Sequence, residues 1–166
     1  NGETISVWSP FNIKLVHATG VELFNHLKIK NLLENIDLSF NLNGTYTRAI
    51  NKHAANRFDR SVDKQLRYTP EWIVNGNMEV IFKDFTFQLF NQYTGQRYQE
   101  ENNELPPLPA YILSDLAISQ QLKAGNIPIS LGARVNNLFN VHYENYLNRA
   151  MPGINYHLQL TFNYNL

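Results

Sequence analysis

The sequence contains no cysteine, which excludes a disulfide framework, a thiolate metal site and a thiol nucleophile within it. It also lacks net charge, because 14 Lys and Arg residues balance 14 Asp and Glu residues, so no electrostatic argument favours a nucleic-acid partner. No apolar run approaches the ~20 residues that a membrane-spanning helix requires. The negative mean hydropathy still allows a membrane barrel, because half of the positions in barrel strands are polar.

Enzyme signatures are missing as well. There is no Gly-x-Ser-x-Gly elbow, no His-Glu-x-x-His pair and no phosphate-binding glycine loop. The histidines, at positions 17, 26, 53, 142 and 157, do not have the spacing of metal ligands. We therefore expect no enzymatic activity, no catalytic residues, no metal site and no cofactor.

The sequence does contain a regular alternation of apolar and polar side chains, which is clearest in its final stretch, INYHLQLTFNYNL. A period of two residues is typical of a β-strand with one apolar and one polar face. Most of these segments have about the ~10 residues with which a tilted strand crosses a bilayer. The period predicts about seven strands, within residues 20–31, 35–46, 71–82, 84–93, 111–122, 127–139 and 154–166.

The connections between these segments alternate in length. Short links are predicted at 31–34, 83–84 and 123–126, and long polar links at 48–70, 94–110 and 140–153. Tight turns at one rim and long loops at the other are typical of an outer-membrane barrel, whereas a soluble sandwich has loops of mixed length at both ends. We therefore predict an all-β, antiparallel transmembrane β-barrel with long extracellular loops.

In such a barrel the apolar positions face lipid and the alternate positions line a wet interior. The predicted interior face consists of amides and hydroxyls, at Asn41, Asn43, Asn75, Asn77, Gln88, Ser119, Asn136, Gln159 and Asn163. Aromatic girdles are expected at both rims of the membrane. They comprise Tyr46, Trp72, Tyr111 and Tyr143 at the extracellular rim, and Phe82, Phe85 and Tyr164 at the periplasmic rim.

An odd number of strands does not form a complete bacterial barrel, and seven strands would leave two unpaired edges in lipid. We therefore interpret residues 1–166 as one partial β-barrel domain, the C-terminal part of a larger barrel. The chain begins at Asn1 without an initiator methionine or a signal peptide, so we expect a signal peptide and earlier strands to lie outside it.

The loop at 51–70 is basic and has aromatic residues between its charges. Arginine side chains pair well with carboxylate and phosphate groups, so a cationic, aromatic mouth would suit an anionic chelate. Alternatively, these charges only keep the loop solvated or bind lipopolysaccharide phosphates. The candidate ligand-binding residues on the long loops are Arg57, Arg60, Arg67, Arg97, Tyr98, Tyr143, Tyr146 and Arg149.

Four stretches together resemble the C-terminal barrel region of TonB-dependent outer-membrane receptors, from about residue 7 to the end. The last one resembles the closing hairpin of that family, although the chain ends on Leu166 where many barrel proteins end on phenylalanine. The stretches are ATGVELFNHLKIK (18–30), LRYTPEWIVNGNMEV (66–80), LPAYILSDLAIS (108–119) and LGARVNNLFNVHYENYLNRAMPGINYHLQLTFNYNL (131–166).

The resemblance implies a barrel of about 22 strands with a plugged lumen, in the outer membrane of a Gram-negative bacterium. It implies active import of a scarce nutrient, and the stretch WSPFNIKLV (8–16) resembles the siderophore and cobalamin branches of the family. The ligand would be a small-molecule chelate or vitamin. The implied partners are the rest of the barrel, its plug domain, the TonB energising complex reached through an N-terminal part outside this chain, and outer-membrane lipid or lipopolysaccharide.

Two other classes stay open at this point. A soluble β-sandwich or lipocalin-like binding module would pack the apolar faces of its strands against one another. A small outer-membrane enzyme barrel, such as a lipid hydrolase, would need a serine with a neighbouring histidine at its lipid-facing rim, and no such pair stands out in the sequence.

Overall fold

A computed structural model describes residues 15–125 and 127–162 of the chain. Asn163, Tyr164 and Leu166, for which we made predictions, lie outside the described residues, as does most of the stretch 8–16. In the described part no helix is long and apolar enough to span a membrane. The strands are β1 (Val16–Leu33), β2 (Ile36–Asn51), β3 (Trp72–Phe82), β4 (Phe85–Thr94), β5 (Tyr111–Ala124), β6 (Ile127–Asn136), β7 (Glu144–Tyr146), β8 (Arg149–Ala150) and β9 (Asn155–Phe162).

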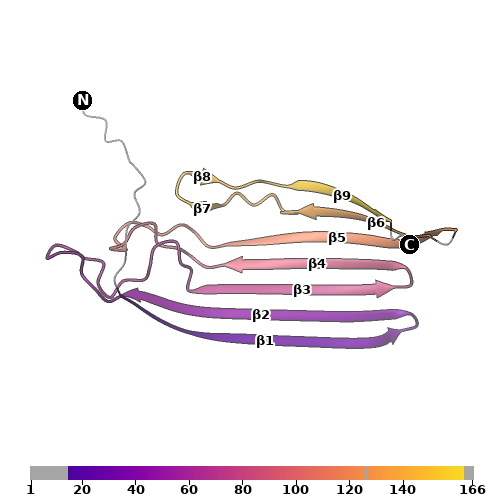
Figure 1. Cartoon of the computed structure of the whole chain (residues 1–166), viewed down its shortest axis with the longest axis horizontal. Coiled ribbons are helices and arrows are strands. Elements are labelled where there is room, and N and C mark those ends of the chain that lie inside the picture. Colours follow the sequence, from indigo (N-terminus) through magenta and orange to yellow (C-terminus); the bar gives the residue numbers. More distant parts are fainter. Residues whose placement is uncertain (1–14, 126, 163–166) are drawn as a thin grey trace, which may run out of the picture.

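Seven of these strands form one antiparallel sheet in the order β1-β2-β3-β4-β5-β6-β9, and β7 and β8 form a separate small hairpin (Figure 1). Each strand of the large sheet pairs with its neighbour along the chain, apart from the step over the hairpin. The sheet is open, with β1 and β9 at its edges. The predicted all-β, antiparallel fold of about seven strands is confirmed, as an unclosed part of a barrel.

The two ends of the sheet differ in the way that the link lengths predicted (Figure 1). At one end, two-residue links join β1 to β2, β3 to β4 and β5 to β6. In these links Asn35, Lys83 and Gly125 have φ values of 65°, 53° and 63°, and residues with positive φ are common in two-residue hairpin turns. At the other end are the first loop (52–71), the second loop (95–110) and the third loop (137–154). The hairpin β7–β8 in the third loop was not predicted, because its strands are too short to show alternation.

The strand register aligns apolar side chains in rows across one face of the sheet. Leu158, Leu160 and Phe162 on this face are 87%, 56% and 61% exposed, and no large side chain of the described residues is fully buried. The described sheet is therefore a single layer without an apolar core, which contradicts the soluble sandwich. An apolar face without a protein partner suits contact with lipid. One complete row consists of Leu27, Phe40, Met78, Leu89, Leu116, Val135 and Tyr156.

The opposite face, which we call the interior face, carries the predicted amides. Asn43 is in register with Asn75, which is in register with Gln92. The face is not uniformly polar, however, because Phe24 and Phe90 also lie on it by register. Leu113 is a further apolar residue of this face, opposite Gln92.

The prediction of an aromatic girdle at the extracellular rim holds for one pair and is wrong for another residue. Tyr46 and Trp72 lie on the apolar face, with their ring centroids 4.8 Å apart. Tyr111 is paired with Thr94 and therefore lies on the interior face, where its ring packs against that of Tyr143 at 4.5 Å. Tyr111 therefore packs on the interior side of the sheet, at the end with the long loops, and not at the lipid interface.

Candidate ligand-binding surface

The first loop is organised around the carboxylate of Asp59. Its Oδ2 accepts a hydrogen bond from the backbone N–H of Ala55 at 2.7 Å, and its Oδ1 accepts from the backbone N–H and the hydroxyl of Ser61 at 2.8 and 2.6 Å. Asn51, at the end of β2, donates to the Ser61 hydroxyl at 2.7 Å. These bonds to Ala55 and Ser61 lower the pKa of Asp59, because they favour the ionised carboxylate.

Acid is therefore expected to loosen the first loop. Because the pKa of Asp59 in the folded loop lies below its ordinary value of 3.8, the stabilisation is fully present above pH 3.8 and is lost as the pH falls through the lower, folded value. A nitroxide label at Ala54→Cys should become more mobile when the pH is taken well below 3.8. Asp59→Asn should raise its mobility at neutral pH. Equal mobility of the label at both pH values in the parent protein would contradict the prediction.

Ion pairs join the first loop to the second. Nη1 of Arg60 lies 3.1 Å from Oε1 of Glu104, and Nη1 of Arg67 lies 3.8 Å from Oε1 of Glu101. The mouth is thus a surface of mixed charge rather than the cationic one that the sequence predicted. Because the paired side chains are exposed, they contribute little to stability. Their guanidinium groups stay accessible from solvent.

A cavity of about 530 Å³ opens between these two loops. Its lining residues include Arg60, Arg67, Glu100, Glu101 and Phe58. Phe58 is 77% exposed, and the guanidinium of Arg57 lies 4.6 Å from its ring centroid. The cavity therefore offers hydrogen-bond donors, acceptors and an aromatic surface to a small polar ligand.

Arg97 in the second loop is buried, with 4% of its surface exposed. Its Nη1 and Nη2 donate to the backbone carbonyls of Gly95 and Glu144 at 2.7 and 2.8 Å, whereas its Nε is buried without a hydrogen-bond partner. Burial lowers the pKa of Arg97, although arginine stays protonated in proteins. Its neighbour Tyr98 accepts a hydrogen bond through its carbonyl from the N–H of Tyr68 at 2.7 Å, which ties the second loop to the first.

The third loop folds back towards both other loops. Tyr143 packs on Tyr111, and burial raises the pKa of the Tyr143 hydroxyl. Tyr146 packs on Tyr68 of the first loop, with the ring centroids 4.9 Å apart. Arg149 is exposed in β8, opposite Tyr146 in the hairpin. The structure thus gathers most of the predicted residues at one end of the sheet, and it gives several of them contacts between loops.

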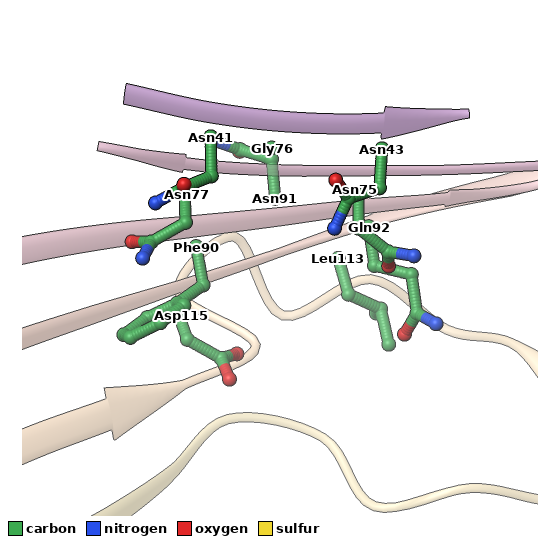
Figure 2. A pocket seen from close by; sticks show the side chains of 10 residues that line it. All are labelled: Asn41, Asn43, Asn75, Gly76, Asn77, Phe90, Asn91, Gln92, Leu113 and Asp115. Atoms are coloured by element: carbon green, nitrogen blue, oxygen red, sulfur yellow. The ribbon is translucent and has the colours of Figure 1, made fainter. Parts of the chain in front are cut away.

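A second polar cavity, of about 260 Å³, lies on the interior face (Figure 2). There the side chains of Asn41, Asn77, Phe90 and Asp115 extend from the same side of the strands (Figure 2). Oδ1 of Asn77 is buried without a hydrogen-bond partner. The sequence had placed the asparagines on this face.

An ion pair that was not predicted from the sequence lies next to this cavity. The carboxylate of Asp115 in β5 accepts from Nη2 of Arg134 in β6 at 2.5 Å and from the backbone N–H of Asn137 at 2.9 Å. Arg134 also donates to Asn136 at 2.7 Å, and its guanidinium lies 5.0 Å from the ring centroid of Phe90. The sequence feature that could have predicted this pair is the presence of two opposite charges on the polar faces of neighbouring strands. Within the described part of the chain, no group of three His, Asp or Glu residues is placed to hold a metal ion.

Comparison with known proteins agrees with this architecture. The family model for the TonB dependent receptor-like β-barrel matches residues 1–138, which leaves out most of the proposed closing hairpin. No curated protein matches the sequence.

The solved structures that share the fold include two proteins named for ferric ligands. The ferric citrate transporter FecA in the unliganded form is 16% identical, with a TM-score of 0.68 over 89% of this chain and 23% of its own. BauA, the ferric preacinetobactin receptor from Acinetobacter baumannii, is 13% identical, with a TM-score of 0.61 over 89% of this chain and 26% of its own. The chain thus spans about a quarter of the length of these structures. It belongs to the family of TonB-dependent receptor β-barrels.

Proposed function

We propose that the chain forms part of the wall and the extracellular loops of an active importer in the outer membrane of a Gram-negative bacterium. Membership of the receptor family carries this proposal. A single-layer sheet with an apolar face and organised long loops at one end supports it. A plug domain, the TonB energising complex and lipopolysaccharide are the proposed partners. The importer binds and releases its ligand without making or breaking covalent bonds in it.

We propose a ferric chelate such as a siderophore as the ligand, and cobalamin as the second candidate. The two structural neighbours are named for ferric citrate and ferric preacinetobactin, and this supports the chelate. The cavity between the first and second loops adds a chemical reason. Arg60 and Arg67 can exchange their exposed carboxylate partners for those of an anionic ligand, because exposed ion pairs are weak.

The enzyme alternative receives no support from Ser61 and Ser114, two of the three buried serines in the described part of the chain. The hydroxyl of Ser114 donates to Asn91, and that of Ser61 donates to Asp59. Neither of these contacts is the serine–histidine pair that a hydrolase would need. Transport therefore remains the function that the described residues support best.

Uptake by the whole receptor polypeptide that contains these residues tests the proposal. The receptor is expressed in a Gram-negative host without its own iron and cobalamin receptors, and uptake of radioactive ferric citrate and of labelled cyanocobalamin is measured. We expect ferric citrate uptake to require TonB. Replacing both Arg60 and Arg67 by alanine should lower uptake at subsaturating ligand about tenfold, as expected for a loss of about 1.4 kcal/mol.

A matched control is Lys123→Ala. Lys123 is exposed at the opposite end of the sheet, next to the two-residue link after β5, so uptake should not change. If the receptor takes up cyanocobalamin but not ferric citrate, cobalamin becomes the proposed ligand in place of the ferric chelate. If TonB changes the uptake of neither ligand while receptor levels in the membrane are normal, the proposal of an importer for these two ligand classes is wrong.

A further inference from the structure

We propose that Arg97 is a positioning residue that fastens the third loop to the second and thereby sets the place of the β7–β8 hairpin at the mouth. The consequence for ligand capture rests on the proposed function, whereas the fastening itself does not. The sequence had suggested a direct role for Arg97 in ligand binding. Its contacts assign it to the protein instead.

The guanidinium of Arg97 joins three segments of backbone. Nη1 donates to the carbonyl of Gly95 at 2.7 Å, just after β4. Nη2 donates to the carbonyl of Pro109 at 3.3 Å, just before β5, and to that of Glu144 at 2.8 Å, in β7. The last bond connects residues that are 47 positions apart in the chain. A single side chain thus holds both ends of the second loop and the start of the hairpin.

The chemistry of these contacts selects arginine. A planar guanidinium directs several N–H groups at fixed angles, so it can serve several carbonyls at once, whereas an ammonium is a compact charge on a flexible stem. The backbone of Arg97 is itself fixed, because its N–H and carbonyl exchange hydrogen bonds with the buried Leu108. The guanidinium also lies 4.9 Å from the ring centroid of Tyr111. The two terminal nitrogens of this buried cation are bonded to carbonyls, and only its buried Nε lacks a hydrogen-bond partner. A guanidinium that is 4% exposed and bonded in this way is unsuited to exchange with a ligand.

A second attachment lies beside the first. The hydroxyl of Tyr111 donates to Oδ1 of Asn145 at 2.8 Å, and its ring packs on Tyr143. Because Tyr111 is on the interior face, the middle of the third loop, at residues 143–145, is held on that side of the sheet. Further along, Tyr146 reaches Tyr68 of the first loop. The third loop therefore crosses from its own strands, β6 and β9, to the loop between β2 and β3.

In this arrangement Arg97 affects ligand capture indirectly, through the position of the β7–β8 hairpin. Tyr146 and Arg149, which the hairpin carries, are candidate ligand contacts, and their position depends on residues 143–145. If the guanidinium is removed, the hairpin loses its attachment at Glu144, and the second and third loops can move independently. Ligand affinity should then fall, while the translocation step, which these residues do not touch, keeps its maximal rate.

The test uses the whole receptor in outer-membrane vesicles, in a background without other cysteines. Spin labels are placed at Leu147→Cys in the turn of the hairpin and at Lys123→Cys at the far end of the sheet. Arg97→Met should broaden the distance distribution between the two labels at least twofold, and Arg97→Lys should broaden it less. In ferric citrate uptake, Arg97→Met should raise the half-saturation concentration about fivefold and change the maximal rate less than twofold.

Arg48→Met is the matched control, because Arg48 is an exposed arginine on β2 outside the candidate site. It should leave both measurements unchanged. Tyr111→Phe removes only the hydroxyl that bonds Asn145, so it should broaden the distribution even if Arg97→Met does not assemble. A distribution that stays narrow in every Arg97 and Tyr111 variant that assembles would overturn the proposal. If the label distances respond but ferric citrate is not taken up, the positioning role holds and the proposed ligand is wrong.

Discussion

Leu158→Arg is expected to lower the free energy of unfolding of the whole receptor in lipid by about 2 kcal/mol or more, because an arginine on the lipid face of a barrel costs about 2–4 kcal/mol at the bilayer midplane. Leu158 is 87% exposed on the apolar face of β9, opposite Ala133 of β6. If this face were in contact with water, the substitution would be close to neutral, because the side chain at this position is exposed and makes little contact with the protein. The experiment therefore asks which solvent this face contacts. Urea unfolding from lipid vesicles measures the difference.

Its matched control is the next residue. Gln159 lies on the interior face opposite Gly132, so Gln159→Arg places the same side chain one position further along the same strand and on the other side of the sheet. We expect its cost to stay below about 1 kcal/mol, because lumen positions of barrels are wet. The same cost for both substitutions would mean that the two faces see the same environment, and it would remove the basis for the barrel interpretation.

Asp115→Ala should have the second largest effect, a loss of about 2 kcal/mol in the free energy of unfolding. Its carboxylate holds Arg134 and the backbone N–H of Asn137, and hydrogen bonds to charged groups contribute about 1.5–3 kcal/mol. The side chains of Asp115 and Arg134 are 23% and 44% exposed, so we expect a value near the lower end of that range. The alanine would leave both donors without this partner.

Two further variants separate the charge from the hydrogen bond. Asp115→Asn keeps an oxygen that can accept from Asn137 but loses the charge that pairs with Arg134, so it should cost about half as much. Asn75→Ala, an exposed amide on the same face, should cost less than 0.5 kcal/mol, as is usual for surface substitutions. If Asp115→Ala were as mild as Asn75→Ala, the ion pair would have no role in holding β5 to β6.

Asp115 also links the wall to the loops. Asn137, which it holds, has a left-handed φ of 50° and is the first residue of the third loop. The amide of Asn137 donates to the carbonyl of Val141 at 2.9 Å, and its Oδ1 accepts from the N–H of Val141 at 2.8 Å. The direction in which the third loop leaves β6 thus depends on a carboxylate in the neighbouring strand. We expect Asp115→Ala to loosen this loop as well as the wall.

The sequence by itself determined the strands, the two faces and the two ends of the sheet. These features depend on local geometry: side chains alternate along any strand, and link length alone distinguishes a tight turn from a loop. The alternation even contained the correct orientation of Tyr111, because the adjacent Ile112 is apolar and faces the other side. The error was to assign Tyr111 to a girdle from its position near the rim.

The tertiary structure alone decided which contacts the loop residues make. Arg60 pairs with a carboxylate 44 positions away, and Arg97 donates to a carbonyl 47 positions away. No local sequence pattern could therefore show that the guanidinium of Arg60 is exposed at a cavity and that of Arg97 is buried between loops. The pair of Asp115 and Arg134 likewise depends on the register between β5 and β6. A period of two fixes which side of a strand a charge occupies, whereas its partner is fixed only when distant segments meet.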